Sequence, residues 1–358
     1  MEVLSLFLPQ YHPIPENDEW WGPGYTEWTY VAGSRPLYRG HVQPHLPRDL
    51  GFYDLRVPEV REAQAALARA HGVTGFIYWH YWLAGTELLE RPFREVLTSG
   101  QPEFPFALAW ANHSWERRTG PRPRDLELLR PQTYPGEHDD LAHFASLRPA
   151  FEDPRYIRIN DKPVFFVFEP GNLPDPAGFV ERWQSMASDL GGLYLVAMTV
   201  RSGYGSHQAD GFDAATFGRL PINEAALGPR IRRRLRASGI GRGPERHRYV
   251  AGYPGTPPPG LHDRVIPVVT TNWDNTPRRQ EHGVVVEGAT PALLASQLPG
   301  AIAQARLAPE GEQMLILRSW NEWGEGNYLE PDQEFGTGWL EAIAAGLRDA
   351  SEGPAGDR

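Results

Sequence analysis

Two glutamates three residues apart stand near the end of the chain. Glu322 and Glu325 lie in the run Trp320-Asn321-Glu322-Trp323-Gly324-Glu325-Gly326, which follows the apolar run Met314–Leu317. A carboxylate pair performs acid and base chemistry when its surroundings separate the two pKa values, and tryptophan supplies apolar walls and flat surfaces for sugar rings. The pattern therefore indicates the mouth of a sugar-cleaving site. The alternative is a capped turn with solvated glutamates, for which the tryptophans and glycines would be a costly decoration.

Eight short apolar runs could form the strands that position such a site, and segments with helical spacing of apolar residues separate them. The predicted strands are Val3–Leu8, Gly75–Tyr78, Phe104–Trp110, Pro163–Phe168, Leu193–Val200, the weaker Asp213–Phe217, Val265–Thr271 and Met314–Leu317. The predicted helices are Pro58–His71, with Val60, Ala63, Leu67 and Ala70 on one face, and Asp139–Leu147, Ala177–Leu190 and Thr290–Ala305.

This alternation of continuous apolar strands with helices predicts an α/β fold, a (β/α)8 TIM barrel with elaborated, aromatic-rich βα loops. A doubly wound open sheet is the alternative. Such a sheet would carry a Gly-rich phosphate loop after the first strand, where this chain has Pro9-Gln10-Tyr11-His12. We expect a single catalytic domain over residues 1–350 and a flexible tail at 351–358.

Aromatic and hydrogen-bonding residues follow the predicted strands. Active sites of such barrels lie at the C-terminal ends of the strands, so we expect these residues to line one cavity. They are Gln10-Tyr11-His12, Trp79-His80-Tyr81-Trp82, Trp110-Ala111-Asn112-His113, Glu169, Arg201, Asn272-Trp273-Asp274-Asn275 and Trp320-Asn321-Glu322.

Composition and charge narrow the function further. The 358 residues carry a net charge of -10, which leaves no general basic surface for nucleic acid or anionic lipid. The chain has no cysteine, which excludes disulfides and a thiol nucleophile. The N-terminus runs from Met1 and Glu2 into Pro9 without a basic flank, so it is not typical of a signal peptide, and no apolar run is long enough to span a membrane. We expect a cytoplasmic protein.

The opening of the chain resembles a known family. Phe7-Leu8-Pro9-Gln10-Tyr11-His12-Pro13-Ile14-Pro15-Glu16-Asn17-Asp18-Glu19-Trp20-Trp21-Gly22 and Gly24-Tyr25-Thr26-Glu27-Trp28 look like the WbsX group, often labelled glycosyltransferases and related to glycoside hydrolase family 99. The resemblance continues through Gly40–Pro47, Tyr78–Trp82, Trp110–Asn112 and Trp273–Arg278 and ends in Trp320–Pro331.

The resemblance implies a retaining enzyme that cleaves α-mannosidic bonds on a (β/α)8 barrel. By position in the Glu-Trp-x-Glu arrangement, Glu322 would be the base that activates the sugar's own 2-hydroxyl, which forms a 1,2-anhydro intermediate. Glu325 would be the acid that protonates the leaving oxygen and then activates water. A tethered 2-oxygen has a large effective concentration, and it must be trans to the leaving group, which favours α-manno or α-rhamno sugars.

Further residues are candidates for binding an oligosaccharide or polysaccharide substrate. Aromatic members could serve as sugar platforms or pack under the loops, and polar members could bind hydroxyl groups. The candidates are Tyr11, His12, Glu27, Trp28, Tyr78, His80, Trp82, Trp110, Asn112, Trp273, Asp274, Trp320 and Asn321. Arg278 and Arg279 could meet an acidic substituent or pair with carboxylates. We expect no metal and no cofactor, and Glu16-Asn17-Asp18 fits a helix or turn cap better than a calcium site.

Two alternatives to hydrolysis stay open. One is glycosyl transfer in the synthesis of a surface polysaccharide, although no Gly-rich loop or Asp-x-Asp motif for a nucleotide donor follows a strand. The other is a non-catalytic carbohydrate-binding barrel, which would have no need of the pair Glu322 and Glu325. His113 stands where many relatives have an acidic residue, and the Arg-rich segment 230–248 reads as a solvated helix or a contact for an anionic glycan or partner.

Overall fold

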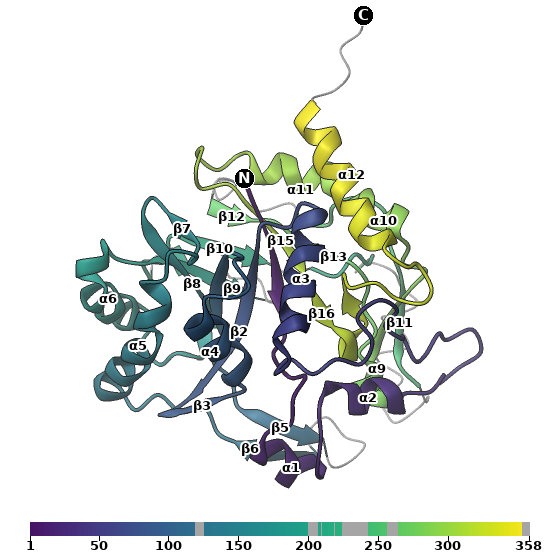
Figure 1. Ribbon diagram of the computed structural model, residues 1–358, viewed down its shortest axis with the longest axis horizontal. Coiled ribbons are helices and arrows are strands. Elements are labelled where there is room, and N and C mark those ends of the chain that lie inside the picture. The colour runs from purple at the N-terminus through teal and green to yellow at the C-terminus, as the bar shows by residue number, and fades with distance from the viewer. Residues whose placement is uncertain are drawn as a thin grey trace, which may run out of the picture.

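The computed structural model describes residues 1–118, 125–199, 207–208, 210–217, 219–223, 243–255 and 264–352. A parallel barrel forms its centre, with strand order β12-β10-β9-β8-β4-β2-β1-β15-β13 (Figure 1). The strands are β1 (Glu2–Phe7), β2 (Gly75–Leu83), β4 (Phe106–Trp110), β8 (Lys162–Phe168), β9 (Tyr194–Thr199), β10 (Ala214–Phe217), β12 (Val265–Ile266), β13 (Val268–Thr270) and β15 (Met314–Arg318). The predicted barrel is confirmed. Each of the eight predicted runs forms one of its eight strands, the seventh being split into β12 and β13.

The seventh position is split. Pro267 separates β12 from β13, because proline has no backbone N–H to continue a hydrogen-bond ladder. Its carbonyl still accepts a bond from the Ile316 N–H at 2.9 Å. β12 then pairs with β10 and β13 pairs with β15, so the split strand joins the two edges of the sheet.

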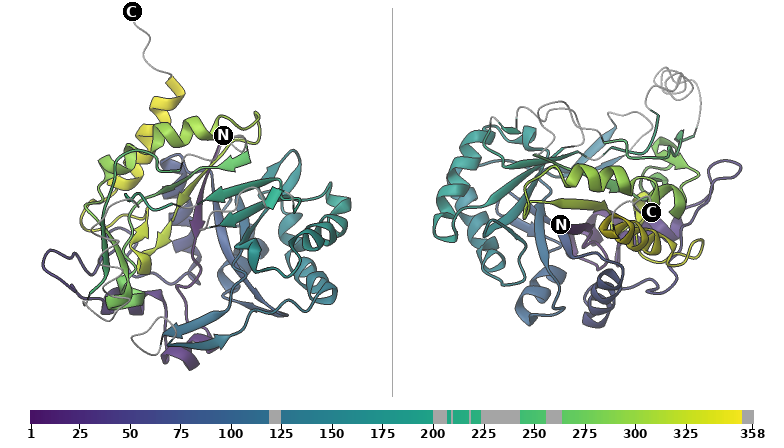
Figure 2. Two further views of the ribbon diagram at one scale, coloured as in Figure 1. Left: turned by 180° about the vertical axis from the view of Figure 1, so that it is seen from behind. Right: turned by 90° about the horizontal axis from the view of Figure 1, so that it is seen from above.

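Helices cover the outside of the barrel (Figure 1, Figure 2). They are α3 (Pro58–Ala70), α4 (Arg91–Ser99), α5 (Glu137–Phe151), α6 (Pro176–Met186), α10 (Pro291–Ala295), α11 (Leu298–Ala305) and α12 (Gly338–Glu352). The predicted single helix 290–305 is two helices. Pro299 stands in the first turn of α11, where its missing N–H is tolerated, whereas inside a continuous helix it would remove a hydrogen bond.

The predicted inner face of α3 is partly wrong: Val60 and Leu67 pack against the core, but the other two predicted residues do not. Arg61, Gln64, Ala65 and Ala68 are buried, while Ala63 and Ala70 are exposed. Both buried polar side chains have partners, since Arg61 donates to Leu55 and Glu95 and Gln64 donates to Glu330. A helix face can therefore turn polar residues inward when hydrogen bonds receive them.

Short elements elaborate the carboxyl ends of the strands. They were not predicted, and Figure 1 shows α1, α2, α9, β5 and β6 at one end of the barrel, away from the N-terminus and α12. They are α1 (Pro15–Trp21) and α2 (Glu27–Gly33) after β1, the hairpin β5 (Trp115–Arg118) and β6 (Leu126–Arg130) after β4, α9 (Thr276–Arg279) after β13, and β16 (Asn321–Glu322), η5 (Trp323–Glu325) and β17 (Asn327–Tyr328) after β15.

The remaining elements are small. They are β3 (Thr86–Leu88), β7 (Arg158–Ile159), η1 (Pro170–Asn172), η2 (Ser188–Leu190), β11 (Glu245–Arg248), η4 (Gln280–His282) and β14 (Val284–Glu287). Of the Arg-rich segment 230–248, residues 230–242 lie outside the described part of the chain, and β11 falls in the rest. The first two residues of the predicted tail 351–358 are the last two residues of α12, and 353–358 lie outside the described residues. No described helix combines the length and apolar character needed to cross a bilayer.

Candidate active site

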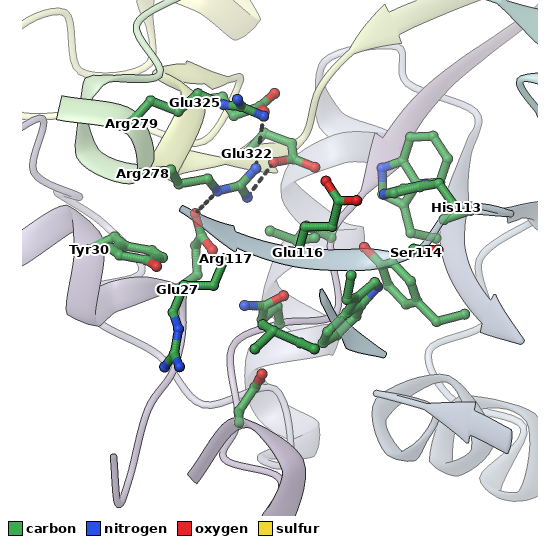
Figure 3. A pocket seen from close by; sticks show the side chains of 18 of the residues that line it. Glu27, Tyr30, His113, Ser114, Glu116, Arg117, Arg278, Arg279, Glu322 and Glu325 are labelled. Atoms are coloured by element: carbon green, nitrogen blue, oxygen red, sulfur yellow. Dashed lines mark hydrogen bonds and ion pairs between the residues drawn. The ribbon is translucent and has the colours of Figure 1, made fainter. Parts of the chain in front are cut away.

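A cavity of about 720 Å³ lies at the carboxyl ends of the barrel strands (Figure 3). Its charged lining consists of Glu27, Glu116, Glu322, Glu325, Arg117, Arg278, Arg279 and Arg318. Its aromatic lining consists of Trp21, Tyr25, Tyr30, Trp79, Tyr81, Trp115 and Phe168. Among the residues that the structure describes, no three His, Asp or Glu side chains are grouped so as to hold a metal ion.

The predicted catalytic glutamates both reach this cavity. Glu322 ends β16, and Glu325 ends the single turn η5, which closes at Gly326 with a φ of 60°. The Glu325 carbonyl accepts a hydrogen bond of 2.7 Å from the Asp274 N–H, and the ring of Trp323 stacks on Tyr328 with centroids 3.8 Å apart. The tight turn thus carries both carboxylates on one fixed loop.

Arg278 joins the carboxylates into one cluster (Figure 3). Its guanidinium lies 2.7 Å from Glu27 Oε1, 2.8 Å from Glu322 Oε2 and 3.1 Å from Glu325 Oε1. The planar guanidinium offers five N–H donors in a fixed fork, which suits several acceptors at once. Of the two roles considered for Arg278, pairing with carboxylates is the one present in this structure.

Burial and charge act in opposite directions on this cluster. Burial raises the pKa of Glu322 to about 7, with further contributions from the negative charges of Glu325 and Glu27, while Arg278 opposes the rise. Burial disfavours the charged form of Arg278, but Glu27, Glu322 and Glu325 together hold its pKa well above its ordinary value. The cluster therefore contains a permanent cation beside a carboxylate that exchanges its proton near neutral pH.

A buried network around Asp274 holds the helix that carries Arg278. Asp274 Oδ2 accepts hydrogen bonds of 2.7 Å each from His41 and Gln43, and its Oδ1 accepts from the backbone N–H and hydroxyl of Thr276. His41 Nδ1 accepts from the Leu37 N–H, which leaves the proton on Nε2 for Asp274. Burial alone would raise the pKa of Asp274, but these donors lower it below its ordinary value. The carboxylate thus pins the start of α9.

A second network lies beneath the loop that carries Glu322 and Glu325. Glu330 accepts hydrogen bonds from Trp323 Nε1 at 2.7 Å, from the Tyr53 hydroxyl at 2.9 Å and from Gln64 at 2.6 Å. Burial raises the pKa of Glu330 to about 7, against the effect of these donors. Because Trp323 stands between Glu322 and Gly324 in the chain, this network fixes the loop from below.

Most predicted binding residues lie beneath the cavity. Of the thirteen, only Glu27 is part of its lining. Asn321 exchanges hydrogen bonds with the backbone of Leu8, and the Tyr11 hydroxyl donates to the Asn321 carbonyl. Trp320 is fully buried in the core, and Asp274 belongs to the network described above. These side chains position the loop that carries Glu322 and Glu325.

The other predicted residues pack inside the protein, either between β2 and the helices or under the loops, and none of them lines the cavity. Trp28 donates to the Tyr53 carbonyl, Trp110 donates to the Trp82 carbonyl, and His80 lies 2.9 Å from His143. Buried with them, and likewise outside the cavity lining, are Tyr78, Trp82, His12, Asn112 and Trp273, the last beneath the guanidinium of Arg318 at 4.4 Å. A direct contact with substrate stays a prediction for these residues.

The side-chain alternation of β2 explains why the residues predicted from this strand are not the ones that line the cavity. Tyr78, His80 and Trp82 were chosen from the sequence, but Trp79 and Tyr81 are the residues of this strand that line the cavity. Successive side chains of a strand point to opposite faces, so an error of one residue exchanges the cavity side for the helix side. The apolar run gave no sign of which parity faced inward.

Several residues that line the cavity are not among the candidates predicted from the sequence. Asn17, Trp21, Tyr25 and Tyr30 come from the segment containing α1 and α2, and Trp115, Glu116 and Arg117 come from β5. The density of Trp, Tyr and Asn between residues 17 and 30 was the available signal, but Asn17 had been read as part of a cap. Of the predicted cap residues, Asp18 does accept a hydrogen bond of 2.8 Å from the Gly24 N–H in the turn after α1, but the Asn17 side chain has no hydrogen-bond partner among the described residues.

Solved structures share the barrel. An endo-α-mannosidase of glycoside hydrolase family 99 from Bacteroides thetaiotaomicron is 12% identical with a TM-score of 0.59, covering 98% of each chain. A protein described as glycoside hydrolase-like is 14% identical with a TM-score of 0.59, covering 96% of this chain and 93% of its own. At these identities the similarity concerns the fold.

Sequence comparisons identify the family. Two curated relatives from strains of Xanthomonas campestris pv. campestris, each described as uncharacterized protein WxcX, are 37% identical over 98% of this chain. The chain spans half the length of these relatives, since 50% of each is covered. The family model described as glycosyltransferase WbsX matches residues 3–343. With nearly all of its length matched, the chain belongs to the WbsX family.

Proposed function

We propose that this protein is a retaining glycoside hydrolase that cleaves α-linked manno-configured glycans, of the mannose or rhamnose type, with participation of the sugar's 2-hydroxyl. The observation that carries the proposal is the pair Glu322 and Glu325, both lining one cavity and both bonded to Arg278. A family named for glycosyl transfer and a fold found in glycoside hydrolases support an enzyme that acts on glycans.

Glu322 is assigned as the base of the first step. It removes the proton of the 2-hydroxyl, the 2-oxygen attacks the anomeric carbon, and the bond from that carbon to the leaving oxygen breaks. Glu325 gives its proton to the leaving oxygen, so that a 1,2-anhydro sugar and a free hydroxyl result. A base works best when its pKa lies near the operating pH, which the raised pKa of Glu322 supports.

The second step reverses these roles. Glu325, now ionised, takes a proton from water as the water oxygen attacks the anomeric carbon. The bond from that carbon to the 2-oxygen breaks, and the 2-oxygen recovers its proton from Glu322. Two inversions give net retention, and both glutamates end as they began. Arg278 gives Glu322 a charged partner while it carries no proton.

Transfer to a sugar acceptor is the second candidate. The family name favours it, and the same intermediate yields a longer glycan when an acceptor hydroxyl replaces water. The chain covers half of its curated relatives, so their full-length activity can include partners or segments beyond this barrel.

Mass spectrometry in ¹⁸O-labelled water tests the proposal. A panel of α-manno- and α-rhamno-linked oligosaccharides is incubated with the wild-type protein and with Glu325→Gln. We expect ¹⁸O at a new reducing end with the wild type only. A longer unlabelled glycan would instead establish transfer, and an intact panel would contradict hydrolysis of these linkages.

A further inference from the structure

Two side chains in the cavity lining have buried polar atoms without a hydrogen-bond partner. Neither Asn17 Nδ2 nor Asn17 Oδ1 is bonded within the described part of the chain, and Glu27 Oε2 is also unpaired. Both side chains are 0% exposed, and both line the cavity. Glu27 Oε1 is already bonded to Arg278, so only its second oxygen is available.

Buried polar atoms without a hydrogen-bond partner are rare, and each one lowers the stability of the fold. Most buried polar atoms in folded proteins are bonded, and an unsatisfied one carries the cost of its lost hydration. Asn17 is the one buried residue of α1, and its side chain neither caps that helix nor bonds a neighbour. A leucine would fill the same space without this cost. The position therefore points to a ligand that supplies both a donor and an acceptor.

Aromatic rings from the same segment flank these groups. Trp21, Tyr25 and Tyr30 line the cavity and pack on one another with centroids 5.4 to 5.7 Å apart. Polar groups beside aromatic surfaces match the edge and the face of a sugar ring. Residues 17–30 thus contribute both kinds of contact to the cavity lining. Of these residues, Glu27 and Tyr30 lie on the opposite side of Arg278 from Glu322 (Figure 3).

The charges of the cavity indicate a neutral ligand. Four glutamates and four arginines line it. Arg278 is shared among three of those glutamates, and Arg117 is paired with Glu127 at 2.6 Å. Arg279 and Arg318 also line the cavity, but a carboxylate or phosphate bound at Glu27 itself would meet a cation that three glutamates already share. It would have to break those pairs, whereas hydroxyl groups leave them intact.

We propose that Asn17 and the free oxygen of Glu27 bind two neighbouring hydroxyl groups of an uncharged sugar residue, in a subsite beside the catalytic carboxylates. This inference rests on the proposed function insofar as the ligand is a glycan, but it requires no cleavage. A hydroxyl group donates to Glu27 Oε2 and accepts from Asn17 Nδ2, and a second donates to Asn17 Oδ1. Substituents on these hydroxyls would block binding.

Binding to the wild-type protein tests the subsite. The probes are S-linked α-1,2- and α-1,3-mannobiose, in which sulfur replaces the bridging oxygen so that the bond persists, and their analogues with one mannuronate residue. Isothermal titration calorimetry measures each Kd. We expect a neutral probe to bind more tightly than its mannuronate analogue, and Asn17→Leu to weaken it at least about tenfold without lowering the melting temperature.

Two variants provide the comparison. Asn172→Leu makes the same change at an exposed position outside the cavity and should leave the Kd unchanged. Asn17→Asp keeps the shape of the side chain but loses the donor, and should also weaken binding, which covers the case in which Asn17→Leu does not fold.

Several results would overturn the subsite: unchanged binding in both Asn17 variants, tighter binding of the mannuronate probes, or no binding of either neutral probe. A failure of the proposed function has a different signature, namely Asn17-dependent binding of neutral mannobiose by a protein that leaves the O-linked counterparts intact.

Discussion

Glu322 and Glu330 are eight positions apart, and burial raises the pKa of each to about 7, yet their surroundings differ. Glu322 lines the cavity, and its side chain accepts a hydrogen bond from the Arg278 guanidinium. Glu330 is 1% exposed, lies outside the cavity lining and is bonded by Trp323, Tyr53 and Gln64, none of them charged. A perturbed pKa by itself therefore does not separate a reacting carboxylate from a structural one.

Glu322 and Glu330 differ in their access to the cavity and in whether a charged side chain is bonded to them. A substrate can reach Glu322, and Arg278 supplies a charge that stabilises its ionised form during proton transfer. No substrate reaches Glu330, whose donors hold Trp323 and so the loop that carries Glu322 and Glu325. We infer a catalytic role for the first and a positioning role for the second, and the following experiments test that contrast.

The largest effect is expected from Glu322→Gln. Loss of the base should lower kcat/KM by roughly 10²–10⁴-fold on every cleaved substrate, including those with very good leaving groups. Glu330→Gln should retain activity within about tenfold, because its side chain touches no substrate. Steady-state kinetics of both variants gives the comparison, and equal losses would contradict the different roles.

Glu325→Gln should show a selective loss. Without the acid, unactivated glycosides should lose roughly 10²–10⁴-fold in kcat, while aryl glycosides with very acidic leaving groups retain most of their rate in the first step. The measurement is the dependence of the rate on the leaving-group pKa. The same loss for all leaving groups would argue against Glu325 as the acid.

Arg278→Gln should shift the pH profile. Arg278 lowers the pKa of Glu322, so its removal should raise that pKa further and move the rising limb of kcat/KM to higher pH. At neutral pH we expect a loss of about tenfold or more, since each pKa unit corresponds to a tenfold change in the ionised fraction. Arg279→Gln is the control, because Arg279 is an exposed neighbour that forms no ion pair with the described residues. An unmoved limb would contradict the electrostatic role.

The wild-type pH profile distinguishes the two possible roles of Glu322. As a base it must be ionised in the free enzyme, so kcat/KM should fall about tenfold per pH unit below about 7. If Glu322 were instead the acid, kcat/KM would fall above that pH. Initial rates between pH 4 and pH 10, at substrate concentrations below KM, show whether kcat/KM falls below or above pH 7.

The smallest expected effect concerns stability. Glu330 has a folded pKa of about 7 against an ordinary value of 4.5, so its contribution is present below pH 4.5 and is lost as the pH rises to about 7. Glu330→Gln should remove up to about 3 kcal/mol of the decline in unfolding free energy over this range. Urea denaturation at pH 4.5 and pH 8 measures it. An equal decline in the variant would show that Glu330 does not titrate in the fold.

The barrel and the presence of Glu322 and Glu325 in one cavity could be predicted because their signals are local. Continuous apolar runs such as Pro163–Phe168 are typical of strands buried on both faces, and the polar run after Leu317 marks where the last strand opens to the site. The lining aromatics could not be chosen from the same pattern. Trp79 and Trp82 look alike in the sequence, and only the orientation of β2 places one in the cavity.

The sequence alone determined the alternation of strands and helices and the placement of Glu322 and Glu325 on one short loop, since both depend on residues close together in the chain. It also determined the family, because each motif from Phe7 to Pro331 can be compared position by position without a structure. Only the tertiary structure decided that Arg278 joins Glu325 to Glu27, almost 300 residues away, and that Asn17 lines the same cavity. Those relations depend on how barrel closure brings distant loops to one end of the molecule, and no local pattern encodes such distances.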